Sequence, residues 1–226
     1  MRKGDEKRQE VLNTAERLFC QRGYDGTSVQ DILSEMSLSK GGFYHHFASK
    51  DEVLKALCER RSLRMAEFTE ASLNDIATPM GRINAVLHGF MPLRREETAF
   101  MSLVLPMIDR PEGHAIAMTY QDALVASFQP LLRAEMAAAA SVDVICPPVA
   151  DMERVILHVL NRCWLDLAEL LLYSVREGQR CDQLSLLNIL EKYRRAIEVL
   201  MDAPYGSIEI IRVEEWDEVV NNIKLA

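Results

Sequence analysis

The sequence predicts an all-α protein made of a small N-terminal three-helix domain, a larger helical domain and a short mixed tail. Two observations predict this class. Apolar residues recur at helical spacing in almost every segment, and Gly and Pro stand between those segments. The pattern changes only near the C-terminus, where residues 208–213 are short and rich in β-branched side chains.

The composition is that of a globular protein with a sizeable core. Hydrophobic residues make up 49% of the 226 residues and charged residues 27%. The five cysteines form no Cys-x-x-Cys pair, so reduced thiols in a cytoplasmic protein are expected rather than a disulfide framework. We find no signal peptide after Met1 and no apolar run that could span a membrane, so no membrane association is expected.

Charge is distributed unevenly along the chain. The formal net charge is −8, which argues against a wholly basic nucleic-acid-binding protein. Residues 1–50 hold eight Lys/Arg and seven Asp/Glu, whereas the rest holds 18 and 27. A nearly neutral N-terminal module on an acidic body permits local contacts with DNA while opposing non-specific binding.

Four short helices are expected in the first part of the chain. The first has one apolar stripe and ends at Gly23, and Thr27 with Gln30 has the spacing of a capping box for the second. Ser39 is expected to cap a third helix from Lys40 to Phe47, and Ser49 to cap a fourth. The stripe of the first helix consists of Val11, Leu12, Ala15, Leu18 and Phe19.

The later chain is expected to form longer helices. The strongest run over 151–176 and 183–202, and residues 141–150 read as a loop. Pro106 and Pro130 interrupt apolar runs, so kinks or breaks are expected there. The segment from Ile208 to Val213 is expected to be a strand or extended, with a short helix from Glu214.

The third expected helix has the character of a recognition helix. Phe43 and Phe47 share one face and serve as a buried anchor. Gly41 and Gly42 are costly in so short a helix, which favours a helix end that lies close against another backbone, such as DNA in its major groove. Its amides and Lys40 can meet phosphate or guanine. Donors for neighbouring phosphates are Tyr44, His45, His46 and Lys50.

Residues 8–55 closely resemble the DNA-binding domain of the TetR family of transcriptional regulators. The matching stretches are Ala15–Phe19, Gly23–Tyr24, Thr27–Ile32, Ser39–Gly41, Phe43–Phe47 and Ser49–Glu52. The resemblance implies a helix-turn-helix near 28–47 within a domain at 1–48, an effector-binding and dimerisation domain at 49–203 and an extension at 204–226. The residues expected at DNA are Thr27, Ser28, Gln30, Ser39, Lys40, Gly41, Gly42, Tyr44, His45, His46 and Lys50.

The sequence departs from the family at two positions. Ser37 stands in the turn between the second and third helices, where the family usually has glycine. A positive φ there would be strained for serine, so a slightly different turn is expected. Gly42 stands where the family often carries a larger polar residue, so one base contact is expected to be missing.

The resemblance also implies a homodimer that binds a palindromic operator in double-stranded DNA and responds to a small molecule. A dimer interface is expected on the last two long helices, at Leu160, Leu167, Leu171, Leu190, Tyr193 and Ile197. An intramolecular core is the alternative for these stripes. Soft side chains that could line an apolar effector pocket are Phe90, Met91, Met107, Tyr120, Phe128 and Trp164. Ordinary helical core is the alternative for each of them.

Two other classes of function remain to be weighed. The sequence has no metalloprotease, nucleophile-elbow, phosphate-loop or dinucleotide motif, so we expect neither an enzyme nor a cofactor. Single histidines such as His88, His114 and His158 give no metal-binding spacing. The other alternative is a helical ligand-binding or adaptor protein that does not bind an operator, a reading that the Ser37 departure keeps open.

Overall fold

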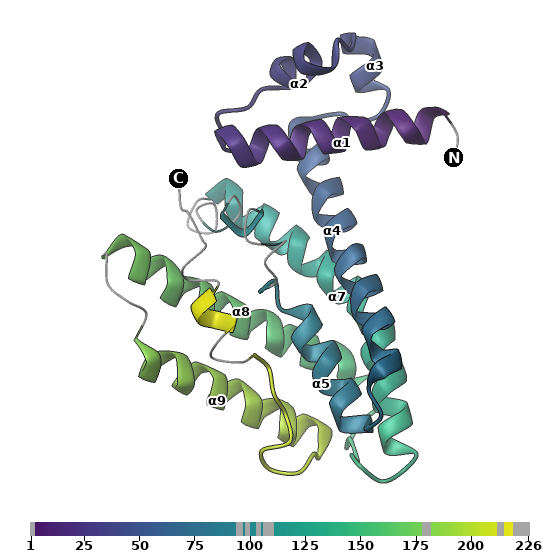
Figure 1. The fold of residues 1–226 in the computed structure, drawn as a ribbon, viewed down its shortest axis with the longest axis vertical. Helices are drawn as coiled ribbons and strands as arrows, with labels where there is room; N and C mark the ends of the chain where they lie inside the picture. Colours follow the sequence, from purple (N-terminus) through teal and green to yellow (C-terminus); the bar gives the residue numbers. More distant parts are fainter. Residues whose placement is uncertain are drawn as a thin grey trace. The chain divides into compact units, whose positions relative to one another are not determined.

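The computed structural model of the chain describes residues 3–93, 97, 100–102, 105, 111–177, 182–211 and 215–218. These residues hold helices, turns and extended segments but no strand, which confirms the all-α class. No helix among them is long and apolar enough to cross a membrane. The helices (Figure 1) are α1 (Lys3–Arg22), α2 (Val29–Met36), α3 (Lys40–Tyr44), α4 (Lys50–Ser72), the 3₁₀ turn η1 (Leu73–Asp75), α5 (Pro79–Phe90), α7 (Pro111–Ala140), α8 (Met152–Arg176) and α9 (Gln183–Met201).

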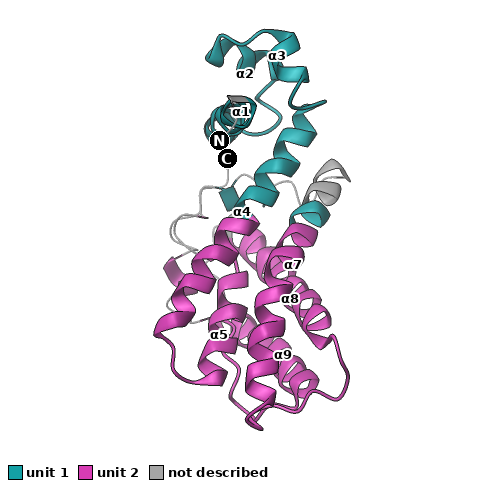
Figure 2. Ribbon diagram, turned by 90° about the vertical axis from the view of Figure 1, so that its right-hand side faces the viewer, with its two compact units in different colours: residues 1–61, 99–120, 224–226 teal, residues 62–98, 121–223 magenta. Residues whose placement is uncertain are grey.

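The chain divides into two compact units (Figure 2). The first contains residues 1–61, 99–120 and 224–226, and the second contains residues 62–98 and 121–223. Each unit buries its own apolar interior, so each supplies its own main source of stability.

In the first unit, α1 buries its predicted stripe completely. Its five apolar residues, from Val11 to Phe19, have no exposed surface. The helix ends at Arg22, and Gly23 takes a φ of 77°, the left-handed conformation that glycine adopts at low cost. Both the helix and its end are therefore as predicted.

A group of ion pairs ties α1 to α4 within this unit. The Glu16 carboxylate accepts hydrogen bonds from Arg60 Nη2 at 2.6 Å and from Arg61 Nε at 2.9 Å. Arg60 Nη1 also donates to Asn13 Oδ1 at 2.7 Å. The side chains of Arg60 and Arg61 are only 10% and 14% exposed, so solvent screens these pairs less than it would pairs on the open surface.

The capping residue of α2 lies one position later than the sequence pattern indicated, although the helix itself runs from Val29 to Met36. Ser28, not Thr27, is the N-cap, and its partner in the capping box is Asp31, not Gln30. The reason is that Thr27 is completely buried and its hydroxyl donates to the Gly23 carbonyl at 2.9 Å. The Thr27 side chain is therefore not available to cap α2.

The turn between α2 and α3 takes the left-handed conformation despite its serine. Ser37 has φ 50° and ψ 37°, so the expected change of turn geometry is not found. Its amide still bonds to the Leu33 and Ser34 carbonyls, which closes α2. Ser39 caps α3 as predicted, accepting from the Gly42 amide at 3.1 Å, but α3 ends at Tyr44 rather than Phe47.

The second unit contains the two long helices predicted near the C-terminus. α8 and α9 run antiparallel and pack side by side (Figure 1), with Asp182 capping α9 through the amides of Leu184 and Ser185. α7 continues through Pro130 to Ala140, so the predicted interruption is not a break. Pro106 lies outside the described residues.

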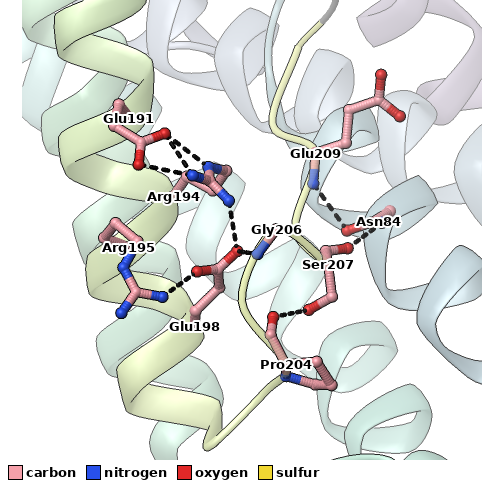
Figure 3. A network of polar contacts seen from close by, with 9 residues as sticks. All are labelled: Asn84, Glu191, Arg194, Arg195, Glu198, Pro204, Gly206, Ser207 and Glu209. Carbon is pink, nitrogen blue, oxygen red and sulfur yellow. Dashed lines mark hydrogen bonds and ion pairs between the residues drawn. The ribbon is translucent and has the colours of Figure 1, made fainter.

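The tail packs on the second unit as an extended segment, which we call the strap, residues 204–211. Ile208, Ile210 and Ile211 are buried, and residues 208–211 form no strand. The Asn84 side chain pairs with it like a peptide group, donating to the Ser207 carbonyl at 2.8 Å and accepting from the Glu209 amide at 3.1 Å (Figure 3). Residues 215–218 are helical and bury Trp216, while residues 212–214 lie outside the described part.

A buried carboxylate fastens the start of the strap. Glu198 is 1% exposed and accepts from Arg194 Nη1 and the Gly206 amide at 2.9 Å and 2.8 Å (Figure 3). Burial raises the pKa of this carboxyl, but Arg195 and the backbone amides of Gly206 and Ile208 outweigh burial and hold the pKa below its usual value. The strap is therefore held by a charged group as well as by apolar packing.

Candidate DNA interface and effector-binding region

The α3 segment has one buried face and one exposed face. Phe43 and Phe47 are buried with their ring centroids 6.1 Å apart, and the Arg8 guanidinium lies over the Phe47 ring at 4.9 Å. The predicted anchor is therefore present. It fixes α3 on the first unit and leaves the opposite side of the helix in solvent.

The exposed face of the α3 segment carries four of the eleven predicted DNA contacts. Lys40, Gly41, Tyr44 and His45 are exposed, and the Tyr44 side chain keeps 56% of its surface in solvent. His46 is half-buried, with its ring 4.9 Å from that of His45 in an edge-to-face arrangement. This face presents a cation, a phenol and two imidazoles, the kinds of group that contact phosphates and base edges.

The two glycines of α3 have different surroundings. A Cβ on Gly41 would meet nothing within 4 Å, whereas one on Gly42 would lie 2.8 Å from Leu38 Cδ1. Packing inside the protein therefore accounts for Gly42. Nothing among the described residues requires glycine at position 41. The close approach of an outside partner to the backbone would explain why glycine stands there.

Two other predicted DNA residues are engaged inside the first unit. Thr27 is buried, as described above. Lys50 Nζ donates to the Tyr24 and Thr27 carbonyls at 2.8 and 3.0 Å and lies 4.0 Å from the centre of the Tyr24 ring. These contacts join α4 to the turn before α2, so both residues position the helix-turn-helix in this structure.

The entrance of α2 is exposed and carries negative charge. Ser28 and Gln30 are exposed, as is Ser39 at the start of α3. Hydrogen bonds from the Ser28 hydroxyl and amide lower the pKa of the Asp31 carboxyl. Asp31 is therefore ionised at neutral pH, where it holds the Ser28 hydroxyl in its capping position.

The predicted effector residues are buried, but they do not form one group. Phe90 and Phe128 stack edge to face in the second unit with centroids 5.4 Å apart, and Met91 and Trp164 are buried in the same unit. Tyr120 belongs to the first unit and packs against Phe100, 5.6 Å away. Met107 lies outside the described residues.

One polar cleft of about 290 Å³ lies in the second unit beside α5. None of the predicted effector residues lines it. His88 at its edge makes a 2.7 Å contact with Glu215. Its lining residues are Thr69, Ser72, Ile76, Gly81, Asn84, Ala85, His88, Gly89 and Glu209.

The predicted dimer residues are largely buried within a single chain. Leu160, Leu167 and Leu171 have no exposed surface, Tyr193 and Ile197 are buried, and Leu190 is half-buried. The apolar side chains that α8 and α9 expose are different ones, and sequence periodicity did not single them out. They are Val155, Tyr173, Leu184, Leu187 and Val199.

Two further structural groups were not anticipated from sequence: the Glu16 ion pairs and the buried Asn161. Charge alone could not reveal Glu16, because its partners are more than forty residues away. The described residues contain no cluster of three or more His, Cys, Asp or Glu side chains that could hold a metal ion.

Comparison with known proteins gives the same assignment for the N-terminal region. The family model described as bacterial regulatory proteins, tetR family, matches residues 11–57. The chain is 44% identical over 55 residues to the uncharacterized HTH-type transcriptional regulator YerO of Bacillus subtilis, covering 24% of this chain and 19% of that protein. It is 38% identical over 61 residues to the HTH-type transcriptional repressor AcnR of Corynebacterium diphtheriae, covering 27% and 32%.

The helical fold beyond this region also has a solved counterpart. A TetR-family transcriptional regulator from Pectobacterium atrosepticum superposes with a TM-score of 0.59 at 24% identity, covering 89% of this chain and 97% of that one. This likeness concerns the fold. The matches to YerO and AcnR span less than a third of either protein. Residues 11–57 are therefore a helix-turn-helix domain of the tetR family of bacterial regulatory proteins.

Proposed function

We propose that the protein is a ligand-responsive transcriptional repressor that binds a palindromic operator as a homodimer and is released by a small apolar effector. One observation carries the DNA-binding part. Lys40, Gly41, Tyr44 and His45 face solvent on a helix whose other side is anchored by two buried phenylalanines. The tetR family model covers this same segment.

The adaptor alternative rested on Ser37, and the structure gives it no support there. The turn keeps its left-handed conformation and α3 keeps its cap. The regulators matched by the N-terminal region likewise do not favour an enzyme.

DNA binding is tested by fluorescence anisotropy with the intergenic DNA that flanks the gene, at two salt concentrations. We expect saturable, sequence-selective binding that weakens as salt rises, because counterions are released when phosphates are contacted. A Tyr44→Ala, His45→Ala variant should lose at least about tenfold in affinity. Phe68→Ala, which removes an exposed ring from the second unit, should not change binding.

Unchanged binding by the double variant would refute the assignment of the recognition helix. Binding no tighter than to random DNA would call for a genome-wide selection of bound fragments. If that selection also failed, the adaptor reading would replace the repressor.

The exposed faces of α8 and α9 are the proposed place for the second copy. Leu184, Leu187 and Val199 lie on one side of α9 at about 100° per residue, and each is at least 46% exposed. Apolar side chains exposed in this way on a helix pair fit a four-helix interface. The buried residues Leu160, Leu167 and Leu171 would support that interface from inside.

Sedimentation velocity tests the dimer. Leu187→Glu with Val199→Glu should shift the protein to monomer, because two charges would lose their hydration at the interface. Val142→Glu, which alters an exposed residue in the turn after α7, is the matched control and should leave the dimer intact. A dimer that survives the double substitution would exclude this face.

An effector can release the dimer from the operator only if it has different affinities for the DNA-bound state and another state of the dimer. The DNA-bound state requires two recognition helices roughly 34 Å apart, one turn of DNA. A ligand in the aromatic interior around Phe90, Phe128 and Trp164 shifts the dimer away from that state only if it binds another state more tightly. Operator affinity measured against effector concentration would show this as a reciprocal loss.

A further inference from the structure

Asn161 is a buried polar side chain whose hydrogen-bonding groups are unused. It lies on α8, is 4% exposed, and has a hydrogen-bond partner at neither Oδ1 nor Nδ2 among the described residues. A buried amide without partners is unfavourable, since both of its polar atoms have lost water. The position therefore requires an explanation beyond packing.

Other buried polar side chains of the second unit show the contrast. Thr69 and Ser174 donate to helix carbonyls at 2.8 and 2.9 Å, and Glu153 accepts from Arg133 at 2.7 Å. The half-buried Asn84 uses both ends of its amide on the strap. The fold thus satisfies comparable groups elsewhere, and Asn161 stands apart from them.

The neighbours of Asn161 along α8 do not supply its partners. Leu157, four residues before it, and Trp164, three residues after it, share its side of the helix, and both are buried. Leu157 has no polar side-chain atom, and the indole N–H of Trp164 makes no hydrogen bond to Asn161 Oδ1. No backbone carbonyl or amide of α8 bonds to the Asn161 side chain either, so a partner has to come from outside the helix.

We infer that Asn161 is the recognition residue for a polar group of the effector, an inference that rests on the proposed function. An amide offers a donor and an acceptor side by side, so its complement carries an acceptor beside a donor. A carboxamide, a lactam and a protonated carboxylic acid each do so. With Leu157 and Trp164 beside it, the site fits such a group on an otherwise apolar, planar molecule.

The first test is thermal unfolding of Asn161→Leu beside Asn84→Leu, two substitutions of the same kind. Removing an unpartnered amide should raise the melting temperature by at least about 2 °C. Removing the partnered Asn84 amide should lower it. A fall with Asn161→Leu like that with Asn84→Leu would mean that a structural partner already satisfies Asn161, and would overturn the inference.

The second test uses Trp164 as a reporter. In a Trp216→Phe background it is the protein's remaining tryptophan. Benzamide, a carboxamide on a flat apolar ring, is titrated beside ethylbenzene, which has no amide. We expect a saturable change of emission with benzamide, and a loss of at least about tenfold in its affinity in Asn161→Leu, with ethylbenzene affected much less. No saturable change, or equal affinity in both proteins, would refute the role of Asn161.

The operator measurement separates this inference from the proposed function. Asn161→Leu should bind operator DNA as tightly as the parent, because the substitution lies in the second unit and not on the α3 face. If the unsubstituted protein binds operator DNA but not benzamide, the proposed repressor function is retained and the role of Asn161 is rejected. If the unsubstituted protein binds benzamide through Asn161 but does not bind operator DNA, the ligand site is retained and the proposed repressor function is rejected.

Discussion

At the scale of single residues, the two glycines of α3 have separable purposes. Gly41→Ala should stabilise the first unit by roughly 0.5–1 kcal/mol, because alanine favours helix and meets nothing within 4 Å. The same methyl should weaken DNA binding if the backbone approaches DNA there. Chemical denaturation and anisotropy on one preparation measure both effects.

Gly42→Ala is the comparison for that prediction. Its Cβ would force Leu38 to move, so a smaller gain or a loss of stability is expected. If Gly41→Ala bound DNA as well as the parent, the close approach at position 41 would be rejected.

Ser37 occupies a conformation that suits another residue better. Its φ of 50° is unfavourable for a side chain with a Cβ, so Ser37→Gly should raise the free energy of unfolding by about 0.5–1 kcal/mol. Ser34→Gly, inside α2, should lower it by a similar amount. Urea unfolding of the three proteins checks this, and equal effects of the two substitutions would show that Ser37 is unstrained.

The roles of some of these residues could be predicted from the sequence, whereas the roles of others could not. Phe43 and Phe47 were predictable, because a spacing of four places two rings on one helix face. The cap of α2 was misplaced by one residue, since Thr27 and Ser28 can both cap and only burial distinguishes them. Asn161 gave no signal, because periodicity cannot show whether a buried amide has a partner.

At the scale of secondary-structure elements, the α1–α4 junction depends on Glu16. Glu16→Ala should destabilise the first unit by about 1–3 kcal/mol, because it leaves two largely buried guanidinium groups without their carboxylate. Glu10→Ala, which removes an exposed pair with Lys7, should change stability by less than about 0.5 kcal/mol. Denaturation curves followed by circular dichroism compare the two, and equal effects would contradict the structural importance of Glu16.

The strap should loosen in acid through Glu198. Its pKa is lowered in the folded protein, so its contribution is present above its ordinary pKa of 4.5 and is lost as pH falls through the lower folded value. Trp216 emission in a Trp164→Phe background should report this loss below about pH 4.5. Glu198→Gln should flatten that pH dependence while weakening the strap at pH 7, and an unchanged profile would assign the effect to other groups.

The helical elements themselves were largely predictable, whereas their partners were not. The stripe on α8 indicated a buried face correctly. A stripe does not reveal whether its own chain or a second copy covers it, and here the chain itself covers Leu160, Leu167 and Leu171. The sequence did not decide the structure of the strap, because the hydrogen bonds that hold it to Asn84 join residues more than a hundred positions apart.

At the scale of the whole molecule, each unit contains a buried thiol. Cys58 lies in the first unit and Cys163 in the second, and burial raises the pKa of each to about 12. Both thiols should stay protonated and unreactive in the native protein at pH 8, whereas the exposed Cys146 reacts at once.

Labelling with a thiol reagent across a denaturant series would then follow the two units separately. In a background that carries Cys20→Ser, Cys146→Ser and Cys181→Ser, Cys58 reports the first unit and Cys163 the second. We expect neither to react before the loss of helical signal in circular dichroism. Fast reaction of either thiol without denaturant would contradict its burial.

Pro130 is expected to make the long helix α7 locally flexible. A proline within a helix has no amide to donate, so the Ala126 carbonyl lacks its usual partner, and the ring crowds the preceding turn. Pro130 and Ala126 both lie in solvent, where water can hydrate that carbonyl. We therefore expect α7 to be more flexible around Pro130 than along the helix on either side. In hydrogen–deuterium exchange, the amides near 127–133 should exchange sooner than those before and after them.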